Sequence, residues 1–429
     1  MKTTRRNFLQ TTALSGVAAF AAPAFLSAKD VNGKLNVACI GVQGMGHASV
    51  QGVSGENIIG LADVAADRLA KTAAEQPKAE TFADFRDMIT KFDGKLDAVT
   101  VGTPDHIHAA ASVFAMKRGI HCYTEKPLSH DVHEAAVMID LAKKKNLKTQ
   151  MGTQIHASDN YRRVVELIQG GAIGKIKEVH CWVGKAWGNR PIPKFDGQVP
   201  ESLNWELWQG PVPERPYNPC YVPGNWRSYW MYGTGTLGDM ACHIVDLPFW
   251  ALSLRHPKTI EANYPAVVCP ETCPIGLQVK YEFPKEEGHD ALTLTWYDHN
   301  LRPPQLAEYN MPNLGLGILF VGADGLLLAD YGRYILYPED KFKDFKAPKP
   351  SIPKSIGHHA EWLKAIKDGG DAQPLCNFGY SGVLTQAVLL GGVAYRAGKK
   401  ITWNPETQTT GDAAADKFLA DERRKGWEL

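Results

Sequence analysis

Lys34-Leu-Asn-Val-Ala-Cys-Ile40 leads straight into Gly41-Val-Gln-Gly44-Met-Gly46, and this junction decides the fold of the first part of the chain. The apolar run predicts a buried strand, and the stretch after the glycines has the character of a helix. Glycines at such a junction let a pyrophosphate approach the backbone at the helix N-terminus, where a Cβ would obstruct it. Gln43 occupies the usual second glycine position, and Gly44 follows it. The junction predicts a dinucleotide-binding turn.

The next apolar run, at 58–62, predicts a second strand that ends on Asp63. A carboxylate about 20 residues beyond the glycines, at the end of the second strand, can accept hydrogen bonds from the adenosine ribose. It favours NAD over NADP, because a 2′-phosphate would meet a negative charge. Arg68 leaves the choice open, since it could lie over the adenine or near that phosphate, or be a solvated surface residue. NAD is the expected cofactor, and NADP is the less favoured one.

Strand and helix patterns alternate through the rest of this region. Further strands are predicted at 96–101 and 120–123, and helices at 65–74 and 107–118. Alternation of this kind with buried strands is typical of a doubly wound parallel sheet in an α/β protein. We therefore expect a Rossmann domain over residues 34–153.

Residues 1–28 follow the order of a signal peptide. Arg5 and Arg6 precede an alanine-rich apolar stretch at 13–25, and 26–28 offers a small-residue cleavage site. The apolar stretch is shorter than the ~20 residues of a membrane span, so no stable membrane insertion is expected after the signal is removed. Twin arginines predict Tat export and a periplasmic mature protein. The alternative is an ordinary helical N-terminus.

Composition excludes several classes of protein. The 429 residues carry 47 Lys and Arg against 46 Asp and Glu, which gives no support to nucleic-acid binding. Eight Cys are too few for a disulfide scaffold, and their spacing with His does not resemble a zinc site, so no metal is expected. Cys269 and Cys273 flank a predicted loop and could form a local disulfide or remain free.

Three further motifs carry a family resemblance: Gly102-Thr-Pro-Asp-His-Ile-His108, Glu125-Lys-Pro127, and Gly238-Asp-Met-Ala-Cys-His-Ile-Val-Asp246. Together with the glycine turn they resemble the Gfo/Idh/MocA oxidoreductases. The resemblance implies an N-terminal Rossmann domain and a C-terminal α+β domain with a large, mostly antiparallel sheet. It also implies hydride transfer between nicotinamide and a hydroxyl of a sugar, glycoside or polyol, with or without a tightly bound and recycled cofactor.

The candidate catalytic residues are Lys126, Asp239 and His243. Lys126 follows the carboxyl end of a predicted strand, where it can stabilise a developing alkoxide, although most lysines are surface residues. Asp239 and His243 are four apart and share one face if the segment is helical. By resemblance, His243 takes the hydroxyl proton and Asp239 binds a neighbouring hydroxyl. A core histidine is the alternative for His243.

Other candidates come from the motifs and from an aromatic-rich stretch before the last motif. Thr103, Pro104 and His106 match family positions beside the ribose and nicotinamide, and Trp226 and Arg227 precede the catalytic segment. The candidate cofactor-binding residues are Gly41, Gln43, Gly44, Met45, Gly46, Asp63, Arg68, Thr103, Pro104, His106, Glu125, Lys126, Trp226 and Arg227. The candidate substrate-binding residues are Lys126, Gln154, His156, Trp187, Tyr229, Asp239, His243 and His358.

Residues 154–429 are expected to form the second domain, for substrate binding and oligomerisation. Alternating patterns predict strands at 176–183, 265–268, 275–283, 291–296, 317–321, 325–329 and 334–338, and helices at 355–367 and 381–397. In the family, such late helices pack back toward the Rossmann domain. Of the aromatic residues between Trp182 and Trp250, most are expected to hold a long loop in place and two or three to touch the ligand.

Two other functions stay open. One is glycoside hydrolysis by transient oxidation and elimination on a bound NAD, and the other is a non-catalytic carbohydrate sensor. The expected partner is a small carbohydrate. A homodimer or homotetramer is also expected, because an antiparallel sheet with one face free of helices invites association.

Overall fold

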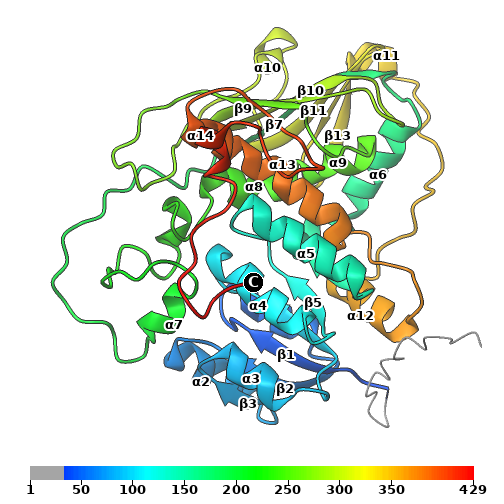
Figure 1. Ribbon diagram of the computed structural model, residues 1–429. Helices are drawn as coiled ribbons and strands as arrows, with labels where there is room; N and C mark the ends of the chain where they lie inside the picture. The colour runs from blue at the N-terminus through cyan, green and yellow to red at the C-terminus, as the bar shows by residue number, and fades with distance from the viewer. Residues whose placement is uncertain (1–32) are drawn as a thin grey trace, which may run out of the picture.

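The computed structural model describes residues 33–429, so the predicted signal peptide lies outside the described residues. Within that part of the chain, the strands form a six-stranded sheet and an eight-stranded sheet. Figure 1 shows the first sheet and its helices in the lower half and the larger sheet at the top, with α13 (Phe378–Ala397) crossing between them.

The first sheet is parallel throughout and has the order β3-β2-β1-β4-β5-β6. Its strands are β1 (Asn36–Ile40), β2 (Asn57–Ala62), β3 (Glu80–Phe82), β4 (Ala98–Val101), β5 (His121–Thr124) and β6 (Thr149–Met151). The helices of this half are α1 (Met45–Gly52), α2 (Ala66–Glu75), α3 (Phe85–Lys91), α4 (Asp105–Met116) and α5 (Val132–Lys144). The predicted Rossmann fold is confirmed. Sequence patterns missed β3 and β6, each of which is only three residues long.

The second sheet has the order β13-β12-β11-β7-β10-β9-β8-β14. Its strands are β7 (Ile176–Val183), β8 (Thr259–Ala262), β9 (Gln278–Phe283), β10 (Leu292–Asp298), β11 (Leu316–Gly322), β12 (Leu326–Ala329), β13 (Tyr334–Tyr337) and β14 (Ile401–Thr402). The β7–β10 pair is parallel and the other pairs are antiparallel, so the predicted mostly antiparallel sheet is confirmed. The strand predicted at 265–268 is wrong, because β8 ends at Ala262 and Val268 is 65% exposed.

Helices cover one face of this sheet, and the segment around α10 (Gln305–Glu308) covers part of the other face. The remaining helical elements are η1 (Gln154–Ala157), α6 (Asp159–Gln169), α7 (Trp205–Gln209), η2 (Asn225–Ser228), α8 (Gly235–Ile244), α9 (Asp246–Leu252), α10 (Gln305–Glu308), α11 (Glu339–Phe342), α12 (His358–Asp368) and α14 (Ala413–Asp416). Figure 1 shows α6, α8, α9 and α13 on the face toward the first sheet and α10 on the other. There Leu306 and Met311 pack over Trp182, so part of the face expected to be free is covered by the chain itself.

Two late helices join the second half of the chain to the first. Trp362 and Ile366 of α12 share a buried cluster with Val37 and Tyr123, and the Trp362 indole donates to the Lys148 carbonyl at 3.0 Å. α13 packs along α5. These contacts fix the two sheets relative to one another and hence the residues that lie between them.

A long connection between β7 and α8, residues 184–234, is called the insert below. Figure 1 shows it at the left, mostly as coil, reaching down to the first sheet. Its aromatic residues pack on each other into a small core, as in the stack of Trp205 on Trp208 with ring centroids 4.8 Å apart. Most of the aromatic run therefore holds the insert together.

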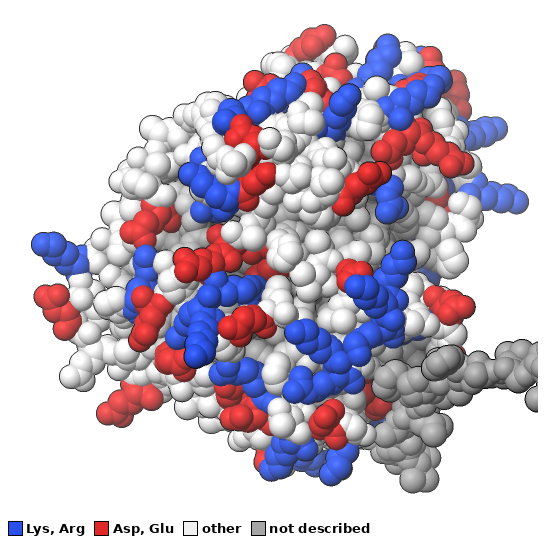
Figure 2. All heavy atoms as spheres, in the orientation of Figure 1, with Lys and Arg blue, Asp and Glu red and all other residues white. Residues whose placement is uncertain are grey.

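The distribution of charge on the surface agrees with the charge balance of the sequence. Figure 2 shows Lys and Arg interspersed with Asp and Glu over the face in view. Within residues 33–429, no helix has both the length and the apolar character needed to cross a membrane.

The packing of Gly46 generates a stability prediction. A Cβ on Gly46 would overlap the Gly41 carbonyl, whereas one on Gly55 would meet open space. Gly46→Ala should lower the free energy of unfolding by on the order of 1–3 kcal/mol or more, and Gly55→Ala should change it by less than about 0.5 kcal/mol. Urea unfolding of both variants checks this, and equal midpoints would contradict the packing described.

Candidate active site

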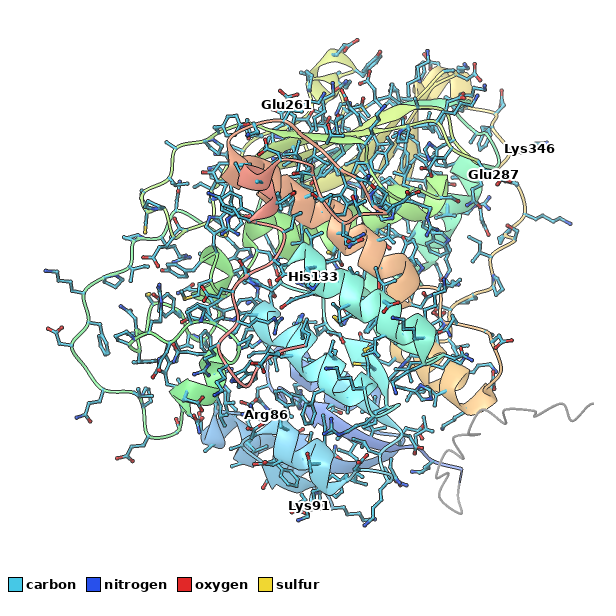
Figure 3. All side chains as sticks on the ribbon, in the orientation of Figure 1. Arg86, Lys91, His133, Glu261, Glu287 and Lys346 are labelled. Carbon is cyan, nitrogen blue, oxygen red and sulfur yellow. The ribbon has the colours of Figure 1, made fainter. Side chains whose placement is uncertain are left out.

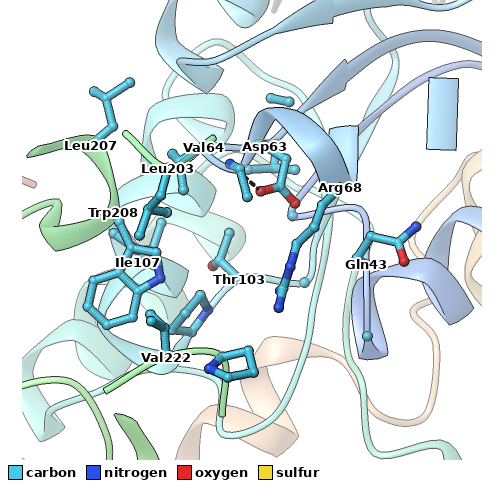
Figure 4. Close-up of a pocket in the computed structure, with 18 of the residues that line it drawn as sticks. Gln43, Asp63, Val64, Arg68, Thr103, Ile107, Leu203, Leu207, Trp208 and Val222 are labelled. Atoms are coloured by element: carbon cyan, nitrogen blue, oxygen red, sulfur yellow. Dashed lines mark hydrogen bonds between the residues drawn. The ribbon is translucent and has the colours of Figure 1, made fainter. Parts of the chain in front are cut away.

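A cavity of about 460 Å³ lies at the carboxyl ends of β1, β2 and β4. One wall is the first domain, with the glycine turn, Asp63 and Thr103. The opposite wall consists of the insert together with Trp427 from the C-terminal tail, residues 417–429. Figure 4 shows side chains of both walls facing the same space, with Asp63 and Arg68 on one side and Leu203 and Trp208 on the other. Ligands of open parallel sheets bind at this edge.

The glycine turn has the backbone that a dinucleotide pyrophosphate requires. Gly44 is the N-cap of α1, has a φ of 63°, and lines the cavity. Gly41 touches Gly102 so closely that a Cβ would lie 2.8 Å from its carbonyl carbon. The free N–H groups of α1 therefore open on the cavity at glycines that have no Cβ to obstruct a ligand. Two buried oxygens in the same wall, Thr103 Oγ1 and Glu125 Oε2, have no hydrogen-bond partner among the described residues. The residues present fit a dinucleotide.

Asp63 is held in place by the backbone around it. Its carboxylate accepts from the Val42 N–H at 3.0 Å and from the Ala65 N–H at 2.9 Å. Burial raises the pKa of Asp63, while these two N–H groups and the Arg68 charge oppose the rise. Lone pairs remain free on the side that faces the cavity, as a ribose contact requires. In Figure 4, Arg68 extends between Gln43 and Thr103.

Most of the candidate cofactor residues line this one cavity. They are Gly41, Gln43, Gly44, Met45, Asp63, Arg68, Thr103, Pro104, Glu125, Lys126, Trp226 and Arg227. Gly46 lies behind the turn, where it packs on Gly41 and Gly102. His106 is buried and points the other way, with Nε2 2.8 Å from the Trp208 carbonyl and Nδ1 3.2 Å from the Tyr232 carbonyl. The structure thus gives His106 a contact with the insert in place of the expected contact with the cofactor.

The apolar wall of the cavity was not anticipated. It includes Leu203, Leu207 and Trp208 from the insert, and Phe85 and Trp427. These residues belong to segments without a motif, and in the sequence Trp208 is only one member of an aromatic run. Their positions depend on how the insert and the tail fold back, which sequence periodicity does not encode.

Lys126 lines the cavity, and its side chain bonds to Asp239, which lies behind the lining residues. Lys126 Nζ donates to Asp239 Oδ1 at 2.7 Å and to the Asp239 carbonyl at 3.0 Å, and each side chain is only 9% exposed. Burial raises the pKa of Asp239, but Lys126 and Arg227 outweigh it and hold the pKa well below its usual range. Burial likewise opposes the Lys126 charge, and Asp239 more than offsets it, so the Lys126 pKa is raised. The pair is ionised at neutral pH.

Two more donors reach the Asp239 carboxylate. Arg227 Nε donates to Oδ1 at 3.1 Å, and Trp187 Nε1 donates to Oδ2 at 2.8 Å. Trp187, expected as a substrate contact, is therefore bonded to the Asp239 carboxylate. Asp239 retains one acceptor direction on Oδ2, which leaves room for the substrate hydroxyl assigned to it.

His243 lies one turn after Asp239 on α8, so the predicted helix brings both residues to one region. The residue is half-buried, and its ring makes no hydrogen bond to any other described residue. Burial, followed by the Lys126 charge, lowers the pKa of His243 to about 3. The imidazole is therefore neutral at pH 7 and has an unprotonated ring nitrogen, but burial and the Lys126 charge make it a weak base in the ligand-free site.

Gln154 lies beside the cofactor cavity. Its amide donates to Glu125 Oε1 at 3.0 Å and to the Tyr123 hydroxyl at 3.2 Å. Ser49 also donates to Glu125 Oε1, at 3.3 Å. Gln154 thus orients Glu125, which lines the cavity next to Lys126.

Three substrate candidates are packed into the protein. His156 is buried, with Nδ1 2.9 Å from Asp246 Oδ2, and His358 Nε2 lies 2.8 Å from the Met151 carbonyl. Tyr229 belongs to the core of the insert. Sequence patterns did not separate these residues from Lys126, Asp239 and His243, because a pattern does not tell which polar side chains are bonded inside the protein.

Metal and disulfide chemistry find little support in the described residues. Ligand atoms of His156, Asp246 and Cys376 lie within 4.8 Å of one another. However, Asp246 is already bonded to His156 and to the Tyr380 hydroxyl, at 2.7 Å, which satisfies it without an ion. Cys269 and Cys273, whose pairing the sequence left open, are both free thiols.

Two family models match this chain. One, described as an oxidoreductase family with an NAD-binding Rossmann fold, matches residues 35–153. The other, described as the C-terminal alpha/beta domain of the oxidoreductase family, matches residues 172–268. Together the matches span half of the chain and include the glycine turn, Asp63, Lys126, Asp239 and His243. The chain belongs to the Gfo/Idh/MocA oxidoreductases and carries their NAD-binding domain, which confirms the resemblance drawn from its motifs.

Curated relatives match at low identity. Levoglucosan dehydrogenase from Pseudarthrobacter phenanthrenivorans is 25% identical over 165 residues, covering 38% of this chain and 35% of the relative. A glycosyl hydrolase family 109 protein from Shewanella baltica is 25% identical over 279 residues, covering 55% of this chain and 54% of the relative. The matches therefore span between 35% and 54% of these two relatives.

A solved structure matches the fold more completely. The WlbA dehydrogenase from Bordetella pertussis, in complex with NADH and UDP-GlcNAcA, superposes with a TM-score of 0.62 at 17% identity. The match covers 86% of this chain and 99% of that chain, and at this identity it is a likeness of fold.

Glu125 generates a pH prediction. Burial raises its pKa from 4.5 to about 7, with Lys126 opposing the rise. Between these values the folded chain keeps a proton that the unfolded chain loses, so this group lowers stability as pH rises through that window. Glu125→Gln should abolish the contribution, on the order of 1–3 kcal/mol. Urea unfolding across that pH range checks it, with Glu214→Gln, at an exposed position, as control. Parallel curves for the natural chain and Glu125→Gln would contradict it.

Proposed function

We propose that this protein is an NAD-dependent oxidoreductase that acts on a hydroxyl of a sugar, glycoside or polyol. One observation carries the proposal: the Lys126–Asp239 pair joins the wall of the dinucleotide cavity to the helix that carries His243. A charged donor and a neutral base are thereby held at the end of the cofactor site. Membership of the family and its sugar and polyol dehydrogenases supports the same reaction class.

The residues divide the reaction between them. Lys126 spends two of its three N–H donors on Asp239, and the third can bind the reacting hydroxyl and stabilise its developing negative charge. His243 offers its free ring nitrogen to the hydroxyl proton, and the negative charge that develops on the substrate oxygen raises the His243 pKa as the proton moves. Asp239 keeps Lys126 charged and in place. When bound, NAD supplies the hydride acceptor for the carbon that bears this hydroxyl. The carbon loses a hydride and the oxygen a proton, which leaves a carbonyl.

Contacts across the cavity support tight retention of the cofactor. The insert is fastened to the first domain, because the Ala66 N–H donates to the Ser202 carbonyl at 2.7 Å and the Asn204 N–H to the Val64 carbonyl at 2.8 Å. Arg424 of the tail donates to the Glu206 carbonyl at 2.7 Å, beside the same wall. A dinucleotide enclosed in this way would be recycled in place.

Retention also favours the second candidate, net glycoside hydrolysis through transient oxidation. The match to a glycosyl hydrolase family 109 protein is the specific observation for it. The two activities differ in products. A glycoside hydrolase releases a free aglycone and an unoxidised sugar from a glycoside, whereas a dehydrogenase gives an oxidised sugar. A non-catalytic sensor would give neither, and the ionised Lys126–Asp239 pair argues against it.

We also propose that the mature protein is periplasmic and that it forms a homodimer or homotetramer. The Arg5 and Arg6 pair followed by an apolar stretch supports export. Replacing both arginines with lysine should leave the precursor in the cytoplasm, which fractionation and immunoblotting of the host cells would reveal. Unchanged export would contradict the Tat assignment.

The catalytic assignment makes a kinetic prediction. The assay substrate is whichever of levoglucosan, myo-inositol and methyl glucosides gives the fastest turnover. His243→Ala should lower kcat by on the order of 10²–10⁴, because the base acts in the transition state. Lys126→Ala should also lower kcat. The control is His133→Ala, an exposed residue labelled on α5 in Figure 3. A folded, NAD-bearing His243→Ala protein with normal kcat would rule out His243 as the base.

A further inference from the structure

The Asp239 carboxylate collects donors from three separate segments of the chain. Lys126, just after β5, and Arg227, in η2, both donate to Oδ1. Trp187, at the start of the insert, donates its indole N–H to Oδ2 at 2.8 Å. Trp187 is the only one of these three that holds the second oxygen, within the described residues. The two oxygens are thus fixed by different partners.

Trp187 is itself fastened to the helix that carries Asp239. Its backbone N–H donates to Thr236 Oγ1 at 2.7 Å, and Thr236 lies three residues before Asp239 on α8. The Arg227 guanidinium carbon lies 5.7 Å from the Trp187 ring centroid. The indole is therefore held in position before any ligand arrives.

Holding the second oxygen has a geometric consequence. A carboxylate turns about its Cβ–Cγ bond in a broad, roughly two-fold well, so one bonded oxygen leaves its plane poorly defined. With Oδ2 held by Trp187, the plane is fixed and Oδ1 stays directed at Lys126. Because Lys126 also donates to the Asp239 carbonyl, two of its N–H directions are fixed, and so is the third.

We propose that Trp187 is a positioning residue that aims the free N–H of Lys126 at the substrate by fixing the Asp239 carboxylate, and that it does so through its indole N–H. The proposal rests on the catalytic role proposed for Lys126. It differs from the role of a stacking platform for a sugar, which needs the ring face and no N–H.

Trp187→Phe separates these roles, because phenylalanine keeps an aromatic face and lacks the donor. Loss of a hydrogen bond to a charged group should lower kcat by roughly 10- to 100-fold, with KM changed by less than about threefold. Rates are taken per folded, NAD-bearing molecule with the assay substrate defined above, so a loss of stability alone would not register. Trp230→Phe is the matched control, because the Trp230 ring packs on Tyr395, with centroids 6.2 Å apart.

Two further measurements test the route through Asp239. In an Asp239→Asn background, Trp187→Phe should cost much less than it does alone, since the carboxylate it positions is gone. A crystal structure of the Trp187→Phe protein should have the carboxylate turned and its contact with Lys126 lengthened from 2.7 Å.

The positioning role of Trp187 and the proposed function would fail in different experiments. If Trp187→Phe keeps normal kcat while Lys126→Ala is inactive, the positioning role is overturned and the proposed function stands. An unmoved carboxylate in the variant, or additive losses in the double variant, would likewise overturn the positioning role. If Lys126→Ala is fully active, the catalytic role proposed for Lys126 fails and the positioning role fails with it. If the natural chain oxidises none of the assay substrates, the proposed function itself fails.

Discussion

The buried ion pair between Lys126 and Asp239 is the interaction on which the site depends. It joins the end of β5 in the first domain to α8 in the second, so the candidate catalytic residues are brought together only when the two domains are packed together. Removing two charges from water is costly unless further polar groups satisfy them. Arg227 and Trp187 supply that satisfaction to Asp239, which is why residues of the insert are part of the site.

The same physics shifts the pKa values of the two acidic residues near Lys126 in opposite directions. Glu125 is almost fully buried and has no cationic hydrogen-bond partner within residues 33–429, so its pKa rises to about 7, whereas the pKa of Asp239 falls. Two carboxyl groups close to one lysine therefore differ in charge near neutral pH. The arrangement leaves Lys126 with one full counter-ion and a donor to spare for a ligand.

Local patterns were enough to predict the four central strands of the first sheet and the glycine turn with Asp63, because buried parallel strands and turns leave strong signals in sequence, whereas the three-residue strands β3 and β6 do not. The apolar wall of the cavity gave no such signal, since Trp208 and Trp427 arrive there through long-range folding. A motif position also does not fix the direction of a side chain: His106 lies in the expected segment but points into the insert.

The cofactor cavity draws its walls from Ile40 at one extreme of the described chain and from Trp427 near the other. A ligand that touches both walls binds only the fully assembled protein, so its binding free energy adds to the stability of both domains at once. Without it, the insert and the tail could open at lower cost than the two sheets. Occupancy by the dinucleotide would thus merge these partial openings into one cooperative transition and protect the insert from proteases.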